Sequence, residues 1–149
     1  MRILDARRVP YMHCEYDASK FTDGASIASH LGQDARRVFK TLVCTTPSNK
    51  IFVFMVPVCN ELDLKRAAAA CNEKSLAMLH QRDLLPLTGY VHGGCSPIGM
   101  KKQFITIADA SVLEFETVIF SAGRIGHQVE ISPGDLGRII PLKFADICA

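Results

Sequence analysis

The sequence of 149 residues predicts an α+β fold, in which a mixed, twisted β-sheet has helices packed around it. Two β-rich runs, residues 38–45 and 51–58, flank a Thr-Pro-Ser-Asn-Lys segment, and this is a hairpin signal. Residues 117–121 and 127–131 flank an Ala-Gly-Arg-Ile-Gly turn and predict a second hairpin. Helical patterns stand before, between and after these hairpins, which is an order typical of the α+β class.

The N-terminal half is expected to hold two strands beyond a first extended segment, and two helices. Residues 9–16 predict a strand or an extended arm. The run 51–56 is nearly all apolar, so its strand should be buried on both faces. Residues 60–70 predict a helix that is rich in alanine. The earlier helix is expected to have Asp23 as N-cap, Gly32 as its end, and an apolar stripe of Ala25, Ile27, Ala28 and Leu31.

In the C-terminal half the elements are shorter and punctuated by glycine and proline. Residues 76–79 fit either a strand or a helix, and Pro86 is expected to cut short a helical turn at 83–87. Strand-like runs at 87–92 and 104–108 flank a glycine-rich loop. Asp109 is expected to start a short turn or helix, and the last helix opens at 132–136 with an early proline.

Composition limits the classes of function. Hydrophobic residues make up 48% and charged residues 21%, so residues 1–149 are expected to form one globular domain. The net charge of +2 predicts at most a local, weak nucleic-acid patch. No apolar run reaches the roughly 18 residues of a membrane span, and the charged N-terminus lacks a signal-peptide core. We therefore expect a cytoplasmic protein that is not bound to a membrane.

The six cysteines form no CxxC pair, and most lie inside apolar runs such as TLVCT and VPVCN. In a cytoplasmic protein they are expected to be reduced, buried small hydrophobic residues. No two candidate ligands have the close spacing of a zinc site. We therefore expect no metal and no cofactor.

The loop at 88–102, TGYVHGGCSPIGMKK, is the most suggestive segment for function. Gly93-Gly94 allows the backbone to approach a ligand and to turn its N–H groups toward an anion or a developing oxyanion. From the glycines alone, a tight turn between two strands is the favoured interpretation. Cys95 with His92 offers a nucleophile and a base, but a small apolar residue beside a strand histidine is the simpler interpretation.

Several charged or polar residues are further candidates. Lys40 interrupts an apolar strand, so it lies either at an edge or in a cleft, where it would need an anionic or carbonyl partner. Lys101 and Lys102 are either a solvated pair or phosphate contacts. The turn around Ser121 and Arg124 could bring a hydroxyl and a guanidinium to a ligand, or is an ordinary hairpin end.

Five motifs together resemble the YbaK/EbsC-type aminoacyl-tRNA editing family. They are VFKTLV at 38–43, LDLKRAA at 62–68, TGY followed by GGCSPIG at 88–99, SAG with Gly126 at 121–126, and KFADI at 143–147. The likeness covers about residues 9–149 with similar spacing. Members are free-standing deacylases related to the editing insertion of bacterial prolyl-tRNA synthetase.

The resemblance implies a twisted, barrel-like sheet and hydrolysis of the ester that joins a wrong amino acid to tRNA, most of all Cys-tRNA(Pro), without metal or cofactor. It implies prolyl-tRNA synthetase as a candidate partner beside the aminoacyl-tRNA. The lysine matching Lys40 is the principal functional residue of the family, and the Cys-specific members are thought to use the substrate's own thiol as nucleophile. We expect Lys40, Gly93 and Gly94 to be catalytic. The expected substrate contacts are Tyr16, Thr41, Pro97, Ser121, Gly123 and Gln128, and the expected tRNA contacts are Arg36, Arg37, Lys101, Lys102 and Arg124.

Two departures from the family pattern bear on specificity. Cys95 stands where an aliphatic residue is usual, and Gln128 stands where the Cys-tRNA(Pro) deacylases have an aspartate. If that aspartate fixes the ammonium group, Gln128 weakens the expectation of strict cysteine specificity. Three alternatives therefore stay open: a deacylase for another small amino acid such as alanine, a non-catalytic aminoacyl-tRNA-binding module, and a hydrolase that uses Cys95.

Overall fold

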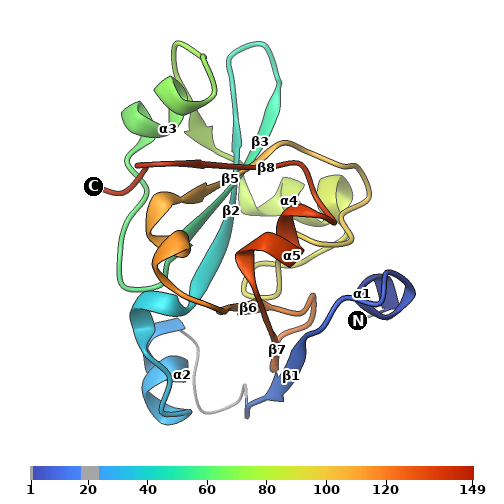
Figure 1. Ribbon diagram of the computed structural model, residues 1–149. Helices are drawn as coiled ribbons and strands as arrows, with labels where there is room; N and C mark the ends of the chain where they lie inside the picture. The colour runs from blue at the N-terminus through green and yellow to red at the C-terminus, as the bar shows by residue number, and fades with distance from the viewer. Residues whose placement is uncertain (1, 18–23) are drawn as a thin grey trace.

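The strands of the protein form two sheets, which Figure 1 shows in ribbon form. The computed structural model describes residues 2–17 and 24–149. The smaller sheet has the order β1 (Met12–Glu15), β7 (His127–Ile131), β6 (Val118–Ser121). The larger sheet has the order β4 (Ala77–Met78), β2 (Phe39–Thr45), β3 (Ile51–Pro57), β5 (Thr106–Asp109), β8 (Leu142–Ala145). The described strands do not close into a barrel.

The helices are short. They are α1 (Arg2–Ala6), α2 (Gly24–His30), α3 (Leu64–Ala70), α4 (Gln81–Thr88) and α5 (Pro133–Gly137), with 3-10 turns η1 (Ala35–Arg37) and η2 (Ala110–Glu114). Figure 1 shows α2 and α3 at opposite ends of the molecule. The predicted α+β class is confirmed, since the larger sheet joins antiparallel and parallel strand pairs and carries helices around it.

The predicted hairpins are both present. β2 pairs with β3 from Phe39↔Pro57 to Thr45↔Ile51, and β6 pairs with β7 from Val118↔Ile131 to Ser121↔Gln128. The expectation that the 51–56 run is buried on both faces is also confirmed, because six of the seven residues of β3 are buried. Neighbouring β5 runs parallel to β3, which is the arrangement in which both faces of a sheet are usually covered.

The segment before the glycine loop differs from the prediction. The expected strand at 87–92 is wrong: α4 continues through Pro86 to Thr88, and Gly89 caps it in the left-handed region at φ 87°. The Thr88 hydroxyl donates to the Leu84 carbonyl at 2.7 Å, and the Gly89 N–H donates to Leu85. These C-terminal bonds carry the helix past the proline, although Pro86 itself contributes no N–H donor.

Other elements were shifted or missed. The alanine-rich helix begins at Leu64 rather than near residue 60, because the Asp63 carboxylate caps it by accepting from the N–H groups of Lys65 and Arg66. Neither α1 nor β8 was predicted. The expected N-cap Asp23 lies outside the described residues.

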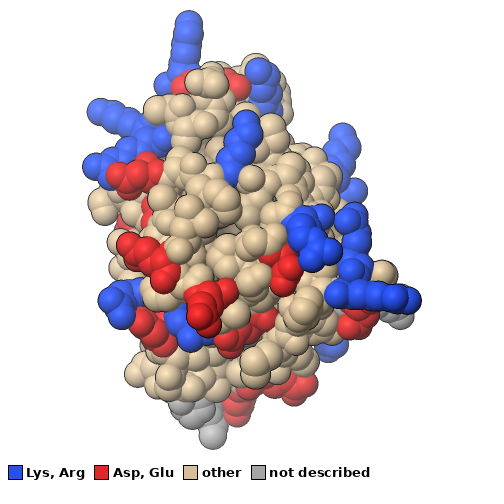
Figure 2. All heavy atoms as spheres, in the orientation of Figure 1, with Lys and Arg blue, Asp and Glu red and all other residues tan. Residues whose placement is uncertain are grey.

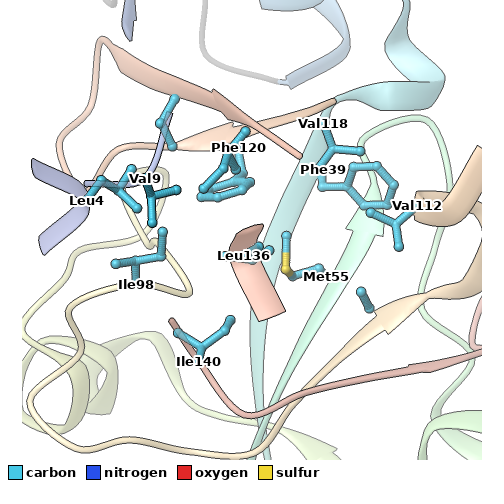
Figure 3. Packing of buried hydrophobic residues seen from close by; sticks show 13 residues of the cluster. Leu4, Val9, Phe39, Met55, Ile98, Val112, Val118, Phe120, Leu136 and Ile140 are labelled. Carbon is cyan, nitrogen blue, oxygen red and sulfur yellow. The ribbon is translucent and has the colours of Figure 1, made fainter. Parts of the chain in front are cut away.

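The main apolar core joins the two sheets. Figure 3 shows Phe39 of β2 and Phe120 of β6 directed into it, with Leu136 of α5 between the sheets. Ile98 of the glycine-rich loop is fully buried in the same cluster. Burial of Ile98 therefore anchors the loop and fixes the position of residues 93–97, which come just before it.

Candidate functional site

One edge of β2 is unpaired over a short stretch. Cys44 and Thr45 pair with β4, and the Val43 carbonyl accepts from Leu79. At the other end, Val38 forms a parallel bridge to Ile119 of β6. Between these contacts, residues 39–42 pair only with β3 among the described strands. We call this stretch, where β2 and β6 separate, the notch.

Lys40 lies in the notch, on the side of the sheet that faces α2. Side chains alternate along a strand, and Val38, two residues before Lys40, packs against Ala28 and Ile119. The Lys40 side chain is 30% exposed, and its Nζ lies 3.5 Å from the Glu61 carboxylate, whose side chain is 84% exposed. The sequence analysis named Lys40 but did not name Glu61. The only indication of Glu61 was that a half-buried amine such as that of Lys40 needs an anionic partner.

Ser121 and Gln128 share this side of the notch. Val38 of the bridge is two residues before Lys40, and Ile119 is two residues before Ser121. Because the bridge is parallel and side chains alternate along each strand, Lys40 and Ser121 project from the same face. Gln128 pairs directly with Ser121 in the β6–β7 register, so their side chains project from the same face. Gln128 is 6% exposed, and its Oε1 accepts from the Gln33 Nε2 at 2.9 Å. No motif in the chain pointed to Gln33.

Thr41 projects to the opposite face, toward the glycine-rich loop. Its neighbour Val43 packs with Cys95, and Phe39 packs in the cluster that holds Ile98. The Thr41 hydroxyl is buried and has no hydrogen-bond partner among the described residues. The pleat of β2 thus separates Lys40 and Thr41 onto the two faces of the sheet, beside its unpaired edge.

The glycine-rich loop packs against the β6–β7 turn. A Cβ on Gly94 would lie 3.1 Å from the Ile125 nitrogen, so the two backbones meet with no room for a side chain. Gly123 lies in the left-handed region at φ 103°, and a Cβ there would meet the Tyr90 ring at 2.9 Å. The Tyr90 hydroxyl donates to the Ile98 carbonyl. The structure therefore joins the loop to the turn at two places, Gly94 against Ile125 and Tyr90 against Gly123.

The loop also contains buried amide groups. Gly93 has φ 86°, and the Gly94 N–H donates to the Val91 carbonyl at 3.0 Å. Cys95 and Ser96 are buried, and the hydrogen bonds among the described residues give their N–H groups no acceptor. Consecutive N–H groups after a left-handed residue form the concavity that binds anions elsewhere.

The remaining predicted substrate contacts lie in the glycine-rich loop or beside the β6–β7 turn. The Tyr16 N–H donates to the Gly126 carbonyl at 2.9 Å, which places it beside the turn. Pro97 is buried in the loop between Ser96 and Ile98. The Ser121 hydroxyl accepts from the Gly123 N–H at 3.2 Å and so closes the start of the turn.

Cys95 is poorly suited to be a nucleophile. Burial raises the pKa of its thiol to about 12, so the reactive thiolate is almost absent near neutral pH. His92 is exposed, and no hydrogen bond joins it to Cys95 among the described contacts. The alternative of a hydrolase that uses Cys95 is therefore disfavoured.

Some of the predicted tRNA contacts have hydrogen-bond or ion-pair partners within the protein. Arg37 donates to Glu130 at 2.5 Å and to Thr117 at 2.8 Å, and Arg36 pairs with Asp34 at 2.7 Å. Lys101 donates to the Pro86 carbonyl at 3.3 Å. Lys102 and Arg124 are exposed, and Arg124 adjoins the turn that meets Gly94. Figure 2 shows basic and acidic side chains interspersed on the face of the molecule that it draws, not gathered into one basic surface.

Two surface hollows lie away from the notch. One, of about 380 Å³, is lined by α1, residues 98–103 and residues 139–140, and the other, of about 230 Å³, lies between β1 and α5. Neither includes Lys40 or the diglycine. Among the described helices, none has the length and apolarity that crossing a membrane requires.

The fold has counterparts among solved structures. One, described as a proposed trans-editing enzyme for prolyl-tRNA synthetase, superposes with a TM-score of 0.86 at 22% identity, over 99% of this chain and 93% of that chain. Another, the hypothetical protein APE2540, gives a TM-score of 0.89 at 20% identity, over 99% and 97%. At such identities the likeness establishes the class of fold, that of a small α+β domain built as in these proteins.

The sequence comparisons go further. The profile of the family described as the aminoacyl-tRNA editing domain matches residues 21–139. The Enterococcus faecalis protein EbsC, whose assigned but unproven activity is that of a Cys-tRNA(Pro)/Cys-tRNA(Cys) deacylase, is 40% identical over 148 residues, which are 99% of this chain and 90% of EbsC. The chain belongs to the aminoacyl-tRNA editing domain family, and the resemblance found in its motifs is confirmed.

Proposed function

We propose that this protein is a free-standing deacylase that hydrolyses mischarged aminoacyl-tRNA, with Cys-tRNA(Pro) as its principal substrate and residues 1–149 as one editing domain. The observation that carries the proposal is the notch, where Lys40 of β2 and Ser121 of β6 lie on one face beside an unpaired strand edge. Family membership and the assigned activity of EbsC support the reaction class.

Lys40 is proposed to bind the ester end of the tRNA. Its amine lies 3.5 Å from a carboxylate that is itself largely in solvent. Such an exposed pair contributes little stability, so a ribose, a phosphate or the ester carbonyl can replace Glu61 at small cost. A positive charge at the carbonyl would also favour the oxyanion of the transition state.

The loop is proposed to supply the oxyanion site. The N–H groups of Cys95 and Ser96 follow the diglycine, and the buried Thr41 hydroxyl lies on the same face of β2. Hydrogen-bond donors that are fixed before the reaction stabilise charge as it develops. The packing of Gly94 against Ile125 holds these donors in place.

The cysteine substrate is proposed to cleave its own ester. Its thiol sulfur attacks the ester carbonyl, the carbon–sulfur bond forms as the bond to the ribose oxygen breaks, and the thiol proton ends on that oxygen. The products are a thiolactone and uncharged tRNA. This route asks no nucleophile of the protein, which agrees with the buried, protonated Cys95.

A second candidate substrate is tRNA carrying alanine. Gln128 is a buried neutral amide paired with Gln33, and it lacks the negative charge that would fix the ammonium of one preferred amino acid. Alanine has no thiol, so its removal would require a water molecule as nucleophile. Single-turnover assays with tRNA(Pro) charged with cysteine or with alanine separate the two candidates.

The deciding variant is Lys40→Ala. Loss of one group that stabilises the oxyanion lowers a rate by about 100-fold, so we expect that loss in single-turnover deacylation. Lys50→Ala is the matched control, because Lys50 also pairs with a glutamate, Glu73 at 3.2 Å, but at the tip of the β2–β3 hairpin. Unchanged deacylation by Lys40→Ala would show that the assignment of the site is wrong, and no deacylation of any mischarged tRNA by the wild-type protein would favour a binding module.

A further inference from the structure

Three side chains with metal-binding atoms converge where β1 pairs with β7. The His13 Nε2 and the His127 Nδ1 are 3.0 Å apart, and the Glu15 Oε1 lies 3.8 Å from the same His127 nitrogen. All three donor atoms lie within 4.8 Å of one another. None of the three belongs to the proposed deacylation site.

The strand register creates this cluster. Glu15 pairs directly with His127, and His13, two residues before Glu15, projects from the same face. The intervening Cys14 projects from the other face, where its partner in the register is Gln128. Because both strands are held by the sheet, the positions of all three Cα atoms are fixed before any ligand arrives.

We propose that His13, Glu15 and His127 form a binding site for a zinc ion. Two imidazoles and one carboxylate are a known donor set for zinc, with a fourth position left for water. Bonds of about 2.0–2.1 Å in tetrahedral geometry require donor atoms about 3.3 Å apart. Two of the three separations, 3.0 and 3.8 Å, lie within about half an ångström of that requirement. The third, between His13 and Glu15, is bounded at 4.8 Å and can shorten when the exposed Glu15 side chain rotates.

The accessibility of the cluster fits the reversible binding of an ion. The Glu15 side chain is 69% exposed and can rotate toward the histidines, whereas the His127 side chain is 25% exposed and held in the sheet. The two rings are nearly parallel, 7° apart, and their facing nitrogens form a hydrogen bond of 3.0 Å, so the exposed His13 ring has to rotate for both lone pairs to point at one ion. His13 and His127 are 114 residues apart in the chain, which is why spacing rules for zinc motifs did not find the site.

The site adjoins the turn that packs on the glycine-rich loop. The His127 N–H donates to the Arg124 carbonyl at 3.1 Å, and the Tyr16 N–H next to Glu15 donates to Gly126. An ion would therefore cross-link β1 to the hairpin that carries this turn. Binding would be a property of the fold, independent of whether the protein deacylates tRNA.

Calorimetric titration of zinc chloride into the chelator-treated full-length protein tests the proposal. We expect one zinc ion per chain, and at least about tenfold weaker binding for His13→Ala and for Glu15→Gln. His92→Ala is the matched control, since His92 is an exposed histidine outside the cluster. Circular dichroism of each variant verifies that it is folded.

Six cysteines could also bind zinc, so the second measurement is the visible spectrum of the cobalt-substituted protein. Nitrogen and oxygen ligands give no thiolate-to-cobalt charge-transfer band, and we expect none. The proposal is overturned by the absence of binding in the millimolar range, by equal affinity in the folded His13→Ala variant, or by a thiolate band.

Discussion

The contact between Gly94 and the β6–β7 turn can be tested by one added methyl group. In Gly94→Ala the Cβ would lie 3.1 Å from the Ile125 nitrogen and 3.4 Å from its Cγ1. Because the nearest atom is backbone, the loop and the turn must separate by a few tenths of an ångström. Gly94 does not have a positive φ, so crowding is the only penalty.

The expected magnitude follows from two opposing terms. Overfilling a packed contact costs about 1–3 kcal/mol, and the stiffer unfolded chain of an alanine variant returns about 0.4–1 kcal/mol. We expect a net loss of about 1 kcal/mol in the free energy of unfolding. The displaced loop should also slow deacylation by about tenfold, since an error of 1 Å in the placement of catalytic groups costs about 100-fold.

Urea unfolding and single-turnover deacylation measure the two effects on the same protein. The matched control is Gly134→Ala in α5, where a Cβ meets nothing within 4 Å. That variant should gain about 0.5–1 kcal/mol from helix propensity and deacylate at the wild-type rate. A Gly94→Ala protein that is as stable and as active as Gly134→Ala would refute the close packing of loop and turn.

Three further outcomes are expected. Burial raises the pKa of Cys95 to about 12, so the stabilisation from its neutral thiol is complete below about pH 8.5 and is lost as pH rises toward 12; burial raises the pKa of Cys44 and Cys148 in the same way, so the loss of stability between pH 8 and pH 10 should be smaller by about 1–2 kcal/mol in Cys95→Ala than in the wild type and unchanged in Cys59→Ala, at an exposed thiol. Asp63→Ala removes a carboxylate that accepts two N–H groups at the start of α3 and should lower the free energy of unfolding by about 1 kcal/mol in urea titrations, and an unchanged midpoint would contradict this capping role. Arg124→Ala should weaken tRNA binding and reduce the slope of log affinity against log salt by about 1, whereas binding that is insensitive to salt would exclude a phosphate contact.

Periodicity and turn chemistry were sufficient for the hairpins and for the mixed α+β class. Both hairpins depend on local patterns of β-rich runs around short turns, and those patterns survive in the fold. The run 87–92 shows where such local patterns fail as a basis for prediction, since Thr88 and Gly89 end a helix there through hydrogen bonds to Leu84 and Leu85. Such bonds depend on the preceding turn, which β propensity does not describe.

The residues of the notch were named from motifs, but their arrangement was not predictable. The family motifs named Lys40 and the diglycine together as catalytic, whereas the pleat directs Lys40 to the α2 side and Thr41 to the loop side. Only the pairing partners of β2 reveal that its edge is unpaired between them. Strand order depends on contacts distant in sequence, and no local pattern in the chain reports it.

The unpaired edge of β2 also bears on self-association. Exposed strand edges act as templates for the strands of other molecules, and a charged side chain on such an edge discourages this pairing. The unpaired stretch, residues 39–42, is short and includes Lys40. We therefore expect an uncharged β-branched residue at position 40 to promote aggregation, whatever the part of the lysine in the reaction.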